Sequence, residues 1–277
     1  MLHTTQDLDG CLIRATDGMI GHVEDLYFDD ESWVVRYLVV DTGTWLYSRK
    51  VLISPIAIDR PDWPARLLPV SMNREQVRHS PGIDTDKPVS RQHERTYLSY
   101  FGYPAYWGGT GLWGAELHPN MTMLGPGGFV SNPYPLRPAG DGIHASPDAF
   151  DLKSDDHHLH DSNAVARYHV EGSDGDIGHV ASLLIDEETW AIRYLVVNTG
   201  SWWLGHEVLV APAWIREVSW GDSTVYVELN RRQIQDAPPY ESPTRLTRES
   251  EASLHRHYGH PGYWTAEAKR GAGQSER

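Results

Sequence analysis

The sequence predicts a mainly β protein: two tandem small β-barrels, each followed by a short helix and an aromatic hook, joined by a Gly/Pro-rich linker. The first observation behind this is a repeat, because RYLVVDTG from Arg36 to Gly43 returns as RYLVVNTG from Arg193 to Gly200. The second is the spacing of short runs of β-formers between Gly, Asp and Pro turns, without long amphipathic helices. That pattern is typical of small closed or nearly closed barrels.

The repeat sets the domain organisation. It runs from Asp174 to Trp264 at a constant offset of 157 residues from Asp17 onward, and roughly a third of the aligned positions are identical. We expect a first repeat with its helical tail over residues 1–107, a flexible linker over 108–163, a second repeat with its tail over 164–264, and a disordered tail over 265–277. Each barrel alone is small for a stable core, so we expect the two copies to pack against each other.

The strands of the first copy follow from β-formers bounded by turn residues. We expect them over residues 8–13, 18–28, 33–40, 51–54 and 66–71, with a short helical segment over 73–79 and the same order in the second copy. Asp29, Glu31 and Arg36 recur in the second copy. Turn chemistry accounts for the acids, and an arginine on a strand face is expected to pair with a neighbouring acid.

A helix and an aromatic hook end each copy. Ser90 and Thr247 are suitable N-caps, and Gly102 and Gly259 stand where the helices should end. The hooks GYPAYW and GHPGYW follow directly, and they hold the four residues that we predict as an interface: Tyr106, Trp107, Tyr263 and Trp264. The alternative is that the hooks pack onto their own barrel or onto the other copy.

Composition excludes several classes of function. The formal net charge of −14 opposes binding to phosphate backbones, so no nucleic-acid partner is expected. Cys11 is the single cysteine, which excludes an intramolecular disulfide and a multi-cysteine metal site. The amino terminus lacks the pattern of a secretory signal, and no apolar run approaches the roughly 20 residues of a membrane helix. We therefore expect a cytoplasmic protein.

Two histidine patterns are candidates for a metal or catalytic site. The segment DDHHLHD from Asp155 to Asp161 has the residue types of a zinc or nickel site, but it lies in the predicted linker, which supplies no fixed geometry. His22 and His179 occupy the same position of both copies, but the nearby Glu24 is not repeated, so neither has a retained orienting partner. We predict no catalytic, cofactor-binding or metal-binding residues and no cofactor.

These motifs resemble the PRC-barrel family, named after the photosynthetic reaction centre H subunit and shared with a bacterial ribosome maturation factor. The resemblance rests on the DGxIGHV opening, the RYLVV strand with its Thr-Gly end, and the Val-Leu-x-x-Pro strand end, and it covers roughly residues 7 to 80 and 164 to 240. It is strongest with bacterial proteins that hold two such barrels. It implies barrels that act through protein contacts and supplies no active-site residues.

The predicted function is a non-enzymatic interaction or assembly module with a protein partner. Four alternatives stay open at this point: self-association into a homo-oligomer, an accessory role at a photosynthetic or other membrane complex, a ribosome-maturation-like role, and an enzyme with its site between the two barrels.

Overall fold

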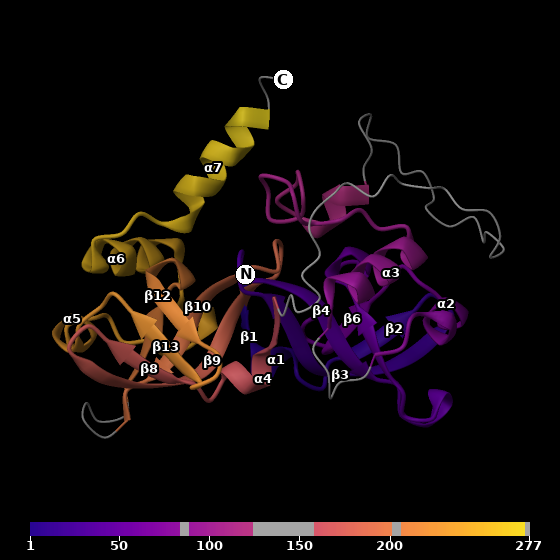
Figure 1. The fold of residues 1–277 in the computed structure, drawn as a ribbon, viewed down its shortest axis with the longest axis horizontal. Coiled ribbons are helices and arrows are strands. Elements are labelled where there is room, and N and C mark those ends of the chain that lie inside the picture. Colours follow the sequence, from indigo (N-terminus) through magenta and orange to yellow (C-terminus); the bar gives the residue numbers. More distant parts are fainter. Residues whose placement is uncertain (84–88, 124–157, 201–205, 275–277) are drawn as a thin grey trace.

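The computed structural model describes residues 1–83, 89–123, 158–200 and 206–274. The protein is mainly β, with two sheets that form two lobes side by side (Figure 1). The first copy builds most of one lobe, and the second copy builds most of the other. None of the helices among the described residues is long and apolar enough to cross a membrane.

The first sheet has six strands in the order β5-β4-β3-β2-β6, with β7 paired to β3. Its strands are β2 (Leu12–Ala15), β3 (Gly18–Asp29), β4 (Val34–Asp41), β5 (Lys50–Ile53), β6 (Leu67–Pro69) and β7 (Leu159–Asp161). β4 is buried on both faces apart from its last residue, which explains its near-continuous run of apolar residues.

The second sheet has seven strands in the order β11-β10-β9-β8-β13-β12, with β1 paired to β9. Its strands are β1 (Leu2–Thr4), β8 (His169–Gly172), β9 (Gly175–Asp186), β10 (Ile192–Asn198), β11 (Glu207–Val210), β12 (Ile215–Ser219) and β13 (Thr224–Val227). Among the described residues the strand order of neither sheet closes on itself, so the structure does not confirm the closed form of the predicted closed or nearly closed barrels.

The helical segments are short and lie at the ends of the strands. They are α1 (Thr5–Leu8), η1 (Gly43–Leu46), η2 (Pro55–Ala57), α2 (Arg74–His79), α3 (Arg91–Phe101), η3 (Pro119–Met123), α4 (Ser162–Val165), η5 (Pro212–Trp214), α5 (Arg231–Gln235), η6 (Pro243–Arg245), α6 (Arg248–Tyr258) and α7 (Tyr263–Gln274). Helices α3 and α6 occupy corresponding places above the two sheets (Figure 1).

The predicted helix caps are confirmed. The Ser90 side chain accepts a hydrogen bond from the backbone of His93, and Gly102 ends α3 with φ +69°. Thr247 and Gly259 do the same for α6, where the glycine has φ +75°. A left-handed residue at this position favours glycine, which explains why glycine recurs at the end of both helices.

Gly21 and Gly178 recur because β3 and β9 pass very close to the turn after the neighbouring strand. A Cβ atom on Gly21 would lie 1.9 Å from the carbonyl oxygen of Asp41, and one on Gly178 would lie 2.0 Å from that of Asn198. Any larger residue would push the paired strands apart.

The two copies exchange their first strands. β1 opens the first copy but pairs with β9 of the second, with Leu2 opposite Asp186 and Thr4 opposite Leu184. β7 opens the second copy but pairs with β3 of the first, with Leu159 opposite Asp29 and Asp161 opposite Tyr27. Each residue of the first pairing corresponds to one of the second at the offset of 157 residues. The exchange is therefore reciprocal, and both exchanged strands pair in the same register.

Between the exchanged strands, residues 33–35 pair with residues 190–192, and we call this contact between the copies the seam. The seam is also symmetric under exchange of the two copies. Val34 at the start of β4 forms an antiparallel bridge with its own counterpart, Ala191. The backbone N–H of Val35 donates to the Trp190 carbonyl at 2.9 Å, and that of Ile192 donates to the Trp33 carbonyl at 2.7 Å. A pseudo-twofold axis therefore passes through the Val34–Ala191 bridge, and the copies support each other as their small size requires.

Two histidines hold the exchanged strands. His3 on β1 stacks on Trp63 with ring centroids 3.5 Å apart and contacts Glu187 of the second copy at 3.2 Å. His160 on β7 repeats this with its counterparts, stacking on Trp220 at 3.3 Å and contacting Asp30 at 2.9 Å. Each exchanged strand is thus fixed by side chains from both copies.

The predicted linker and tail differ from the structure in extent. Residues 108–123 hold the buried Leu112 and Trp113, and residues 158–163 form β7 and the start of α4. Residues 124–157, which carry most of the predicted linker, lie outside the described residues. The expectation of disorder from residue 265 is wrong as far as Gln274, because residues 265–274 belong to α7, in which Glu267 binds Arg193.

The strand exchange predicts that the copies stay together without a covalent connection. Residues 1–130 and 131–277, produced as separate chains in one cell, should co-purify as a 1:1 complex, as size-exclusion chromatography with light scattering would show. Removing residues 1–4 from the first chain should weaken the complex, because β1 and His3 are lost. Two separately folded monomers would contradict the prediction.

Candidate functional site: the seam and its two buried arginines

Arg36 on β4 is buried beside the seam, with 3% of its side chain exposed. Its Nε–H donates to Asp29 at 2.5 Å, one Nη donates to Ser32 at 2.8 Å, and the other donates to the Leu112 carbonyl at 2.7 Å. The ring of Tyr106 lies 3.8 Å from the guanidinium carbon and that of Trp113 lies 4.7 Å from it. The predicted pairing of Arg36 with a nearby acid is confirmed, and every side of the group is covered.

Glu94 of α3 lies next to this arginine and is fully buried. Its carboxylate accepts a hydrogen bond from the Tyr106 hydroxyl at 2.6 Å and contacts Arg91 at 3.3 Å and His158 at 2.6 Å. Burial, followed by the charge of Glu94, raises the pKa of Tyr106 well above its ordinary value, so the hydroxyl remains a donor. The cluster joins α3, the hook and the segment that leads into β7.

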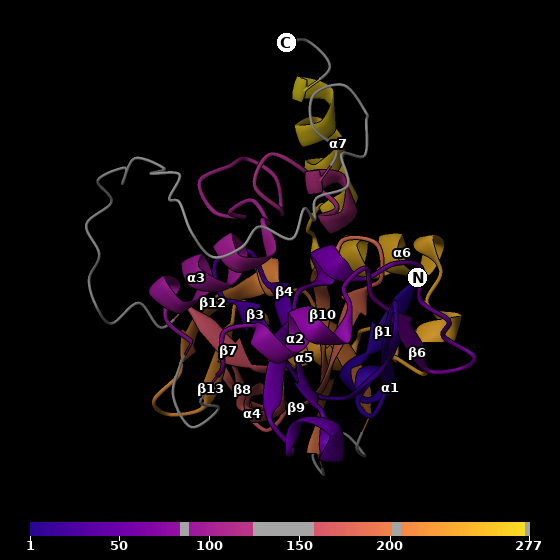
Figure 2. The ribbon, with the colours of Figure 1, turned by 90° about the vertical axis from the view of Figure 1, so that its right-hand side faces the viewer.

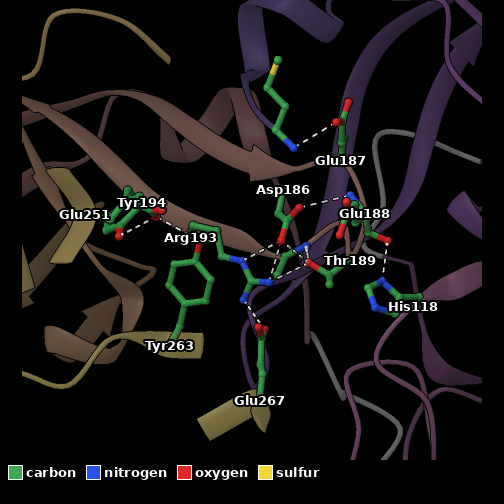
Figure 3. A network of polar contacts seen from close by, with 12 residues as sticks. His118, Asp186, Glu187, Glu188, Thr189, Arg193, Tyr194, Glu251, Tyr263 and Glu267 are labelled. Carbon is green, nitrogen blue, oxygen red and sulfur yellow. Dashed lines mark hydrogen bonds and ion pairs between the residues drawn. The ribbon is translucent and has the colours of Figure 1, made fainter. Parts of the chain in front are cut away.

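The second copy holds the counterpart, Arg193, shown in Figure 3. Its Nε and one Nη donate to Asp186 at 3.1 and 2.7 Å, and the same Nη also donates to Thr189 at 2.9 Å. The other Nη donates to Glu267 of α7 at 2.5 Å. The Arg193 guanidinium lowers the pKa of Asp186 despite the opposing effect of burial.

Glu251 of α6 is the counterpart of Glu94. Its Oε1 accepts hydrogen bonds from the hydroxyls of Tyr194 at 3.0 Å and Tyr263 at 2.9 Å, and Arg248 lies 3.0 Å from Oε2. Burial and the Glu251 carboxylate raise the pKa of Tyr194 far above its ordinary value. Both copies therefore use a buried glutamate to bind the hook tyrosine.

The four predicted interface residues lie against their own copies. Tyr106 is buried and Tyr263 is half-buried, with their rings on the buried arginines. Trp107 and Trp264 are half-buried beside Arg91 and Arg248, at 4.5 and 4.6 Å. Pro104, Ala105 and Pro261 of the hooks are exposed, so a partner can still contact the outer side of both hooks, including the half-buried tryptophans.

Two grooves open along the seam, and each has walls from both copies. The larger groove has a volume of about 790 Å³ and is lined by Pro55, Trp63, Met121, Glu188 and Trp190, among others. The smaller, which we call the Arg193 groove, has a volume of about 570 Å³. Its walls include Trp33, Ser32, Leu112, Arg193, Tyr263 and Glu267. Both volumes lie in the range of ligand sites, roughly 300 to 1,000 Å³.

A pair of carboxyl groups lies where β7 meets β3. Burial raises the pKa of Asp25 to about 7, and the neighbouring Asp161 of the exchanged strand adds to the effect. Asp25 also accepts hydrogen bonds from the Leu26 backbone at 2.7 Å and the Ser162 hydroxyl at 2.9 Å. The corresponding positions in the second sheet are neutral, with Ser182 on β9 and Thr4 on the exchanged strand β1.

The histidines that were candidates for a catalytic or metal site form no such site among the described residues. His22 and His179 are exposed on β3 and β9. His158 and His160 of the DDHHLHD segment contact Glu94 and Asp30, while Asp155, Asp156 and His157 lie outside the described residues. Among the described residues no group of three or more His, Cys, Asp or Glu side chains has metal-site geometry.

Sequence reasoning expected the two copies to associate and left open a site between them, but it missed the strand exchange, the positions of the grooves and the role of Glu267. A signal for the seam was present, because Leu2-His3 recurs as Leu159-His160 at the offset of the main repeat. Trp33 and Trp63 also recur, as Trp190 and Trp220, and they lie in the grooves or against the exchanged histidines. No repeat marks Glu267.

Residues 3–63 match the family described as PRC-barrel domain. This range runs from β1 past η2 to Trp63 and so contains Arg36 and the first-copy side of the seam. No curated protein matches the chain.

Proposed function

Since the chain carries a PRC-barrel domain, we propose that it is a non-enzymatic interaction or assembly module whose protein partner docks along the seam. The observation that carries this proposal is the reciprocal strand exchange, which joins two sheets into one platform with grooves on both sides of the pseudo-twofold axis. A partner on the seam would contact both copies at once, so it would recognise the assembled protein rather than either half.

The polar core supports a structural role. Arg36, Glu94 and their counterparts Arg193 and Glu251 are each paired with polar groups of their own copy. Removing one partner would leave a buried charge unpaired and would destabilise the fold. We further propose that the second copy is a barrel of the same type. The matching register of the exchanged strands and the matching arginine and glutamate sites support this.

Affinity capture of the tagged protein from its own cells tests the function. Soluble and membrane fractions are kept separate, and co-purifying proteins are identified by mass spectrometry. A stoichiometric protein partner is expected. A partner found only in the membrane fraction would direct the proposal to the assembly of a membrane complex, and recovery of the bait alone from both fractions would contradict the proposal.

Trp107→Ala and Trp264→Ala test the contribution of the hooks. Each should lower the free energy of unfolding by about 1–2 kcal/mol, less than for a fully buried tryptophan, because the side chains are half-buried on arginines. Urea denaturation measures this. Tyr47→Ala is the control, because Tyr47 is 95% exposed and its loss should cost less than about 0.5 kcal/mol. Unchanged stability with loss of the captured partner would make the hooks intermolecular.

A further inference from the structure

The two copies differ in what covers the outer edge of the buried arginine. In the first copy the chain after the hook folds over Arg36, where the Leu112 carbonyl accepts a hydrogen bond and the Trp113 ring covers one face of the guanidinium. The indole N–H of Trp113 also donates to the Thr189 carbonyl of the second copy at 2.8 Å. Leu112 and Trp113 are buried, so the first site is closed.

In the second copy the chain after the hook continues as α7, which projects away from the body in both views (Figures 1 and 2). The corresponding space is the Arg193 groove. Tyr263 covers one face of Arg193 at 4.0 Å, as Tyr106 covers Arg36, and no second aromatic ring among the described residues lies over the guanidinium. With Glu267 in place, 6% of the Arg193 side chain is exposed. Ser32, the counterpart of Thr189, lies in the wall.

We propose that the Arg193 groove is a binding site for a partner's peptide segment in which a carboxylate lies next to an aromatic side chain. The carboxylate binds the outer N–H groups of Arg193, and the ring stacks on the guanidinium as Trp113 does on Arg36. In the first copy the indole N–H of Trp113 donates to the carbonyl of Thr189, so an indole of the partner would have the carbonyl of the counterpart Ser32 as its acceptor. The inference rests on the proposed function, and it names the chemistry of the partner at one part of the seam.

Glu267 is the internal competitor for this site. Its carboxylate lies 2.5 Å from the Nη1 atom of Arg193, while 20% of its side chain is exposed (Figure 3). It belongs to α7, whose sequence contains Gly271 and Gly273, residues that weaken a helix. A carboxylate from a partner can therefore replace Glu267 without disturbing the Arg193–Asp186 pair, which holds the arginine in place.

The test uses the full chain and N-acetyl-tryptophan, a probe that combines a carboxylate with an indole. Isothermal titration should give a dissociation constant of about 0.1–1 mM, as expected for a ligand of this size. Glu267→Gln should tighten binding by about tenfold, because the competing charge is removed. Glu249→Gln, at an exposed carboxylate of α6, should leave binding unchanged. N-acetyl-tryptophanamide and N-acetylalanine should bind at least about tenfold more weakly.

A second variant separates loss of the site from loss of the fold. Ala213→Trp places a bulky side chain at an exposed position in the groove wall and should abolish binding, whereas Ala65→Trp, exposed and outside the groove, should not. Thermal unfolding confirms that both variants are folded. Equal binding of the acid and the amide, or binding that survives Ala213→Trp, overturns the proposal. Partner capture that persists with Ala213→Trp would overturn this site alone and leave the proposed function intact.

Discussion

Replacing Arg36 by alanine is expected to lower the free energy of unfolding by about 3–5 kcal/mol, because it leaves the Asp29 carboxylate buried without its partner. The side chains of Arg36 and Asp29 are 3% and 5% exposed, so water cannot replace the lost contacts. The Leu112 carbonyl and the rings of Tyr106 and Trp113 lose the same group. Chemical denaturation at neutral pH measures the change.

Arg193→Ala is the matched control within the same chain. Its acidic partners, Asp186 and Glu267, have side chains that are 15% and 20% exposed and can be rehydrated, so a smaller loss of about 1–3 kcal/mol is expected. The double variant Asp29→Leu, Arg36→Met should recover part of the stability lost in Arg36→Ala, because no buried charge is left unpaired. Equal losses for the two single variants would contradict the difference in burial.

Stability is expected to fall as the pH rises from about 4 to about 7, because Asp25 binds a proton more tightly in the folded state. Its pKa is raised to about 7 in the folded protein, while an unfolded aspartate has a pKa of about 3.9. Within this window the folded state holds a proton that the unfolded state has lost, so each increase in pH favours unfolding. The full difference corresponds to about 4 kcal/mol, and because Asp25 and Asp161 are partly hydrated we expect on the order of 2 kcal/mol.

Asp25→Ser tests this with the residue that the second copy carries at the same position. The variant should be more stable than the natural chain at pH 8, and the part of the pH dependence due to this pair should disappear. Asp161→Thr, again the residue of the other copy, should act in the same direction. Denaturation midpoints at pH 4.5, 6 and 8 measure both. An unchanged slope between pH 4.5 and 8 in Asp25→Ser would refute the role of the pair.

Local chemistry made much of the fold predictable. The capping residues Ser90 and Thr247 and the glycines that end α3 and α6 act within a few residues of chain, so the sequence identifies both helices. The pairing of Arg36 with Asp29 was predictable for a similar reason, because a buried arginine on a strand requires an acid nearby. The repeat then transferred each of these inferences to the second copy.

The seam depended on information that local patterns lack. Alternation of apolar residues shows that Leu2–Thr4 and Leu159–Asp161 suit a strand, but it does not say which sheet a three-residue strand joins. Composition also misled at both hooks. The Gly-rich residues after Trp107 predict a flexible linker, yet Trp113 is buried there, and the polar residues after Trp264 predict disorder, yet Glu267 binds Arg193. In both places the segment contacts an arginine that is distant in the sequence, Arg36 in the first copy and Arg193 in the second.

The exchange of first strands also determines when this protein can finish folding on the ribosome. The first copy cannot complete its sheet until Leu159–Asp161 has been made, long after its own last strand has left the exit tunnel. At ordinary rates of synthesis, about 5–20 residues per second, this delay is on the order of ten seconds. During that interval the side of β3 that receives β7 is an open strand edge, and such edges pair readily with other chains. The nascent first copy is therefore the stage of this protein's life at which a chaperone would matter most.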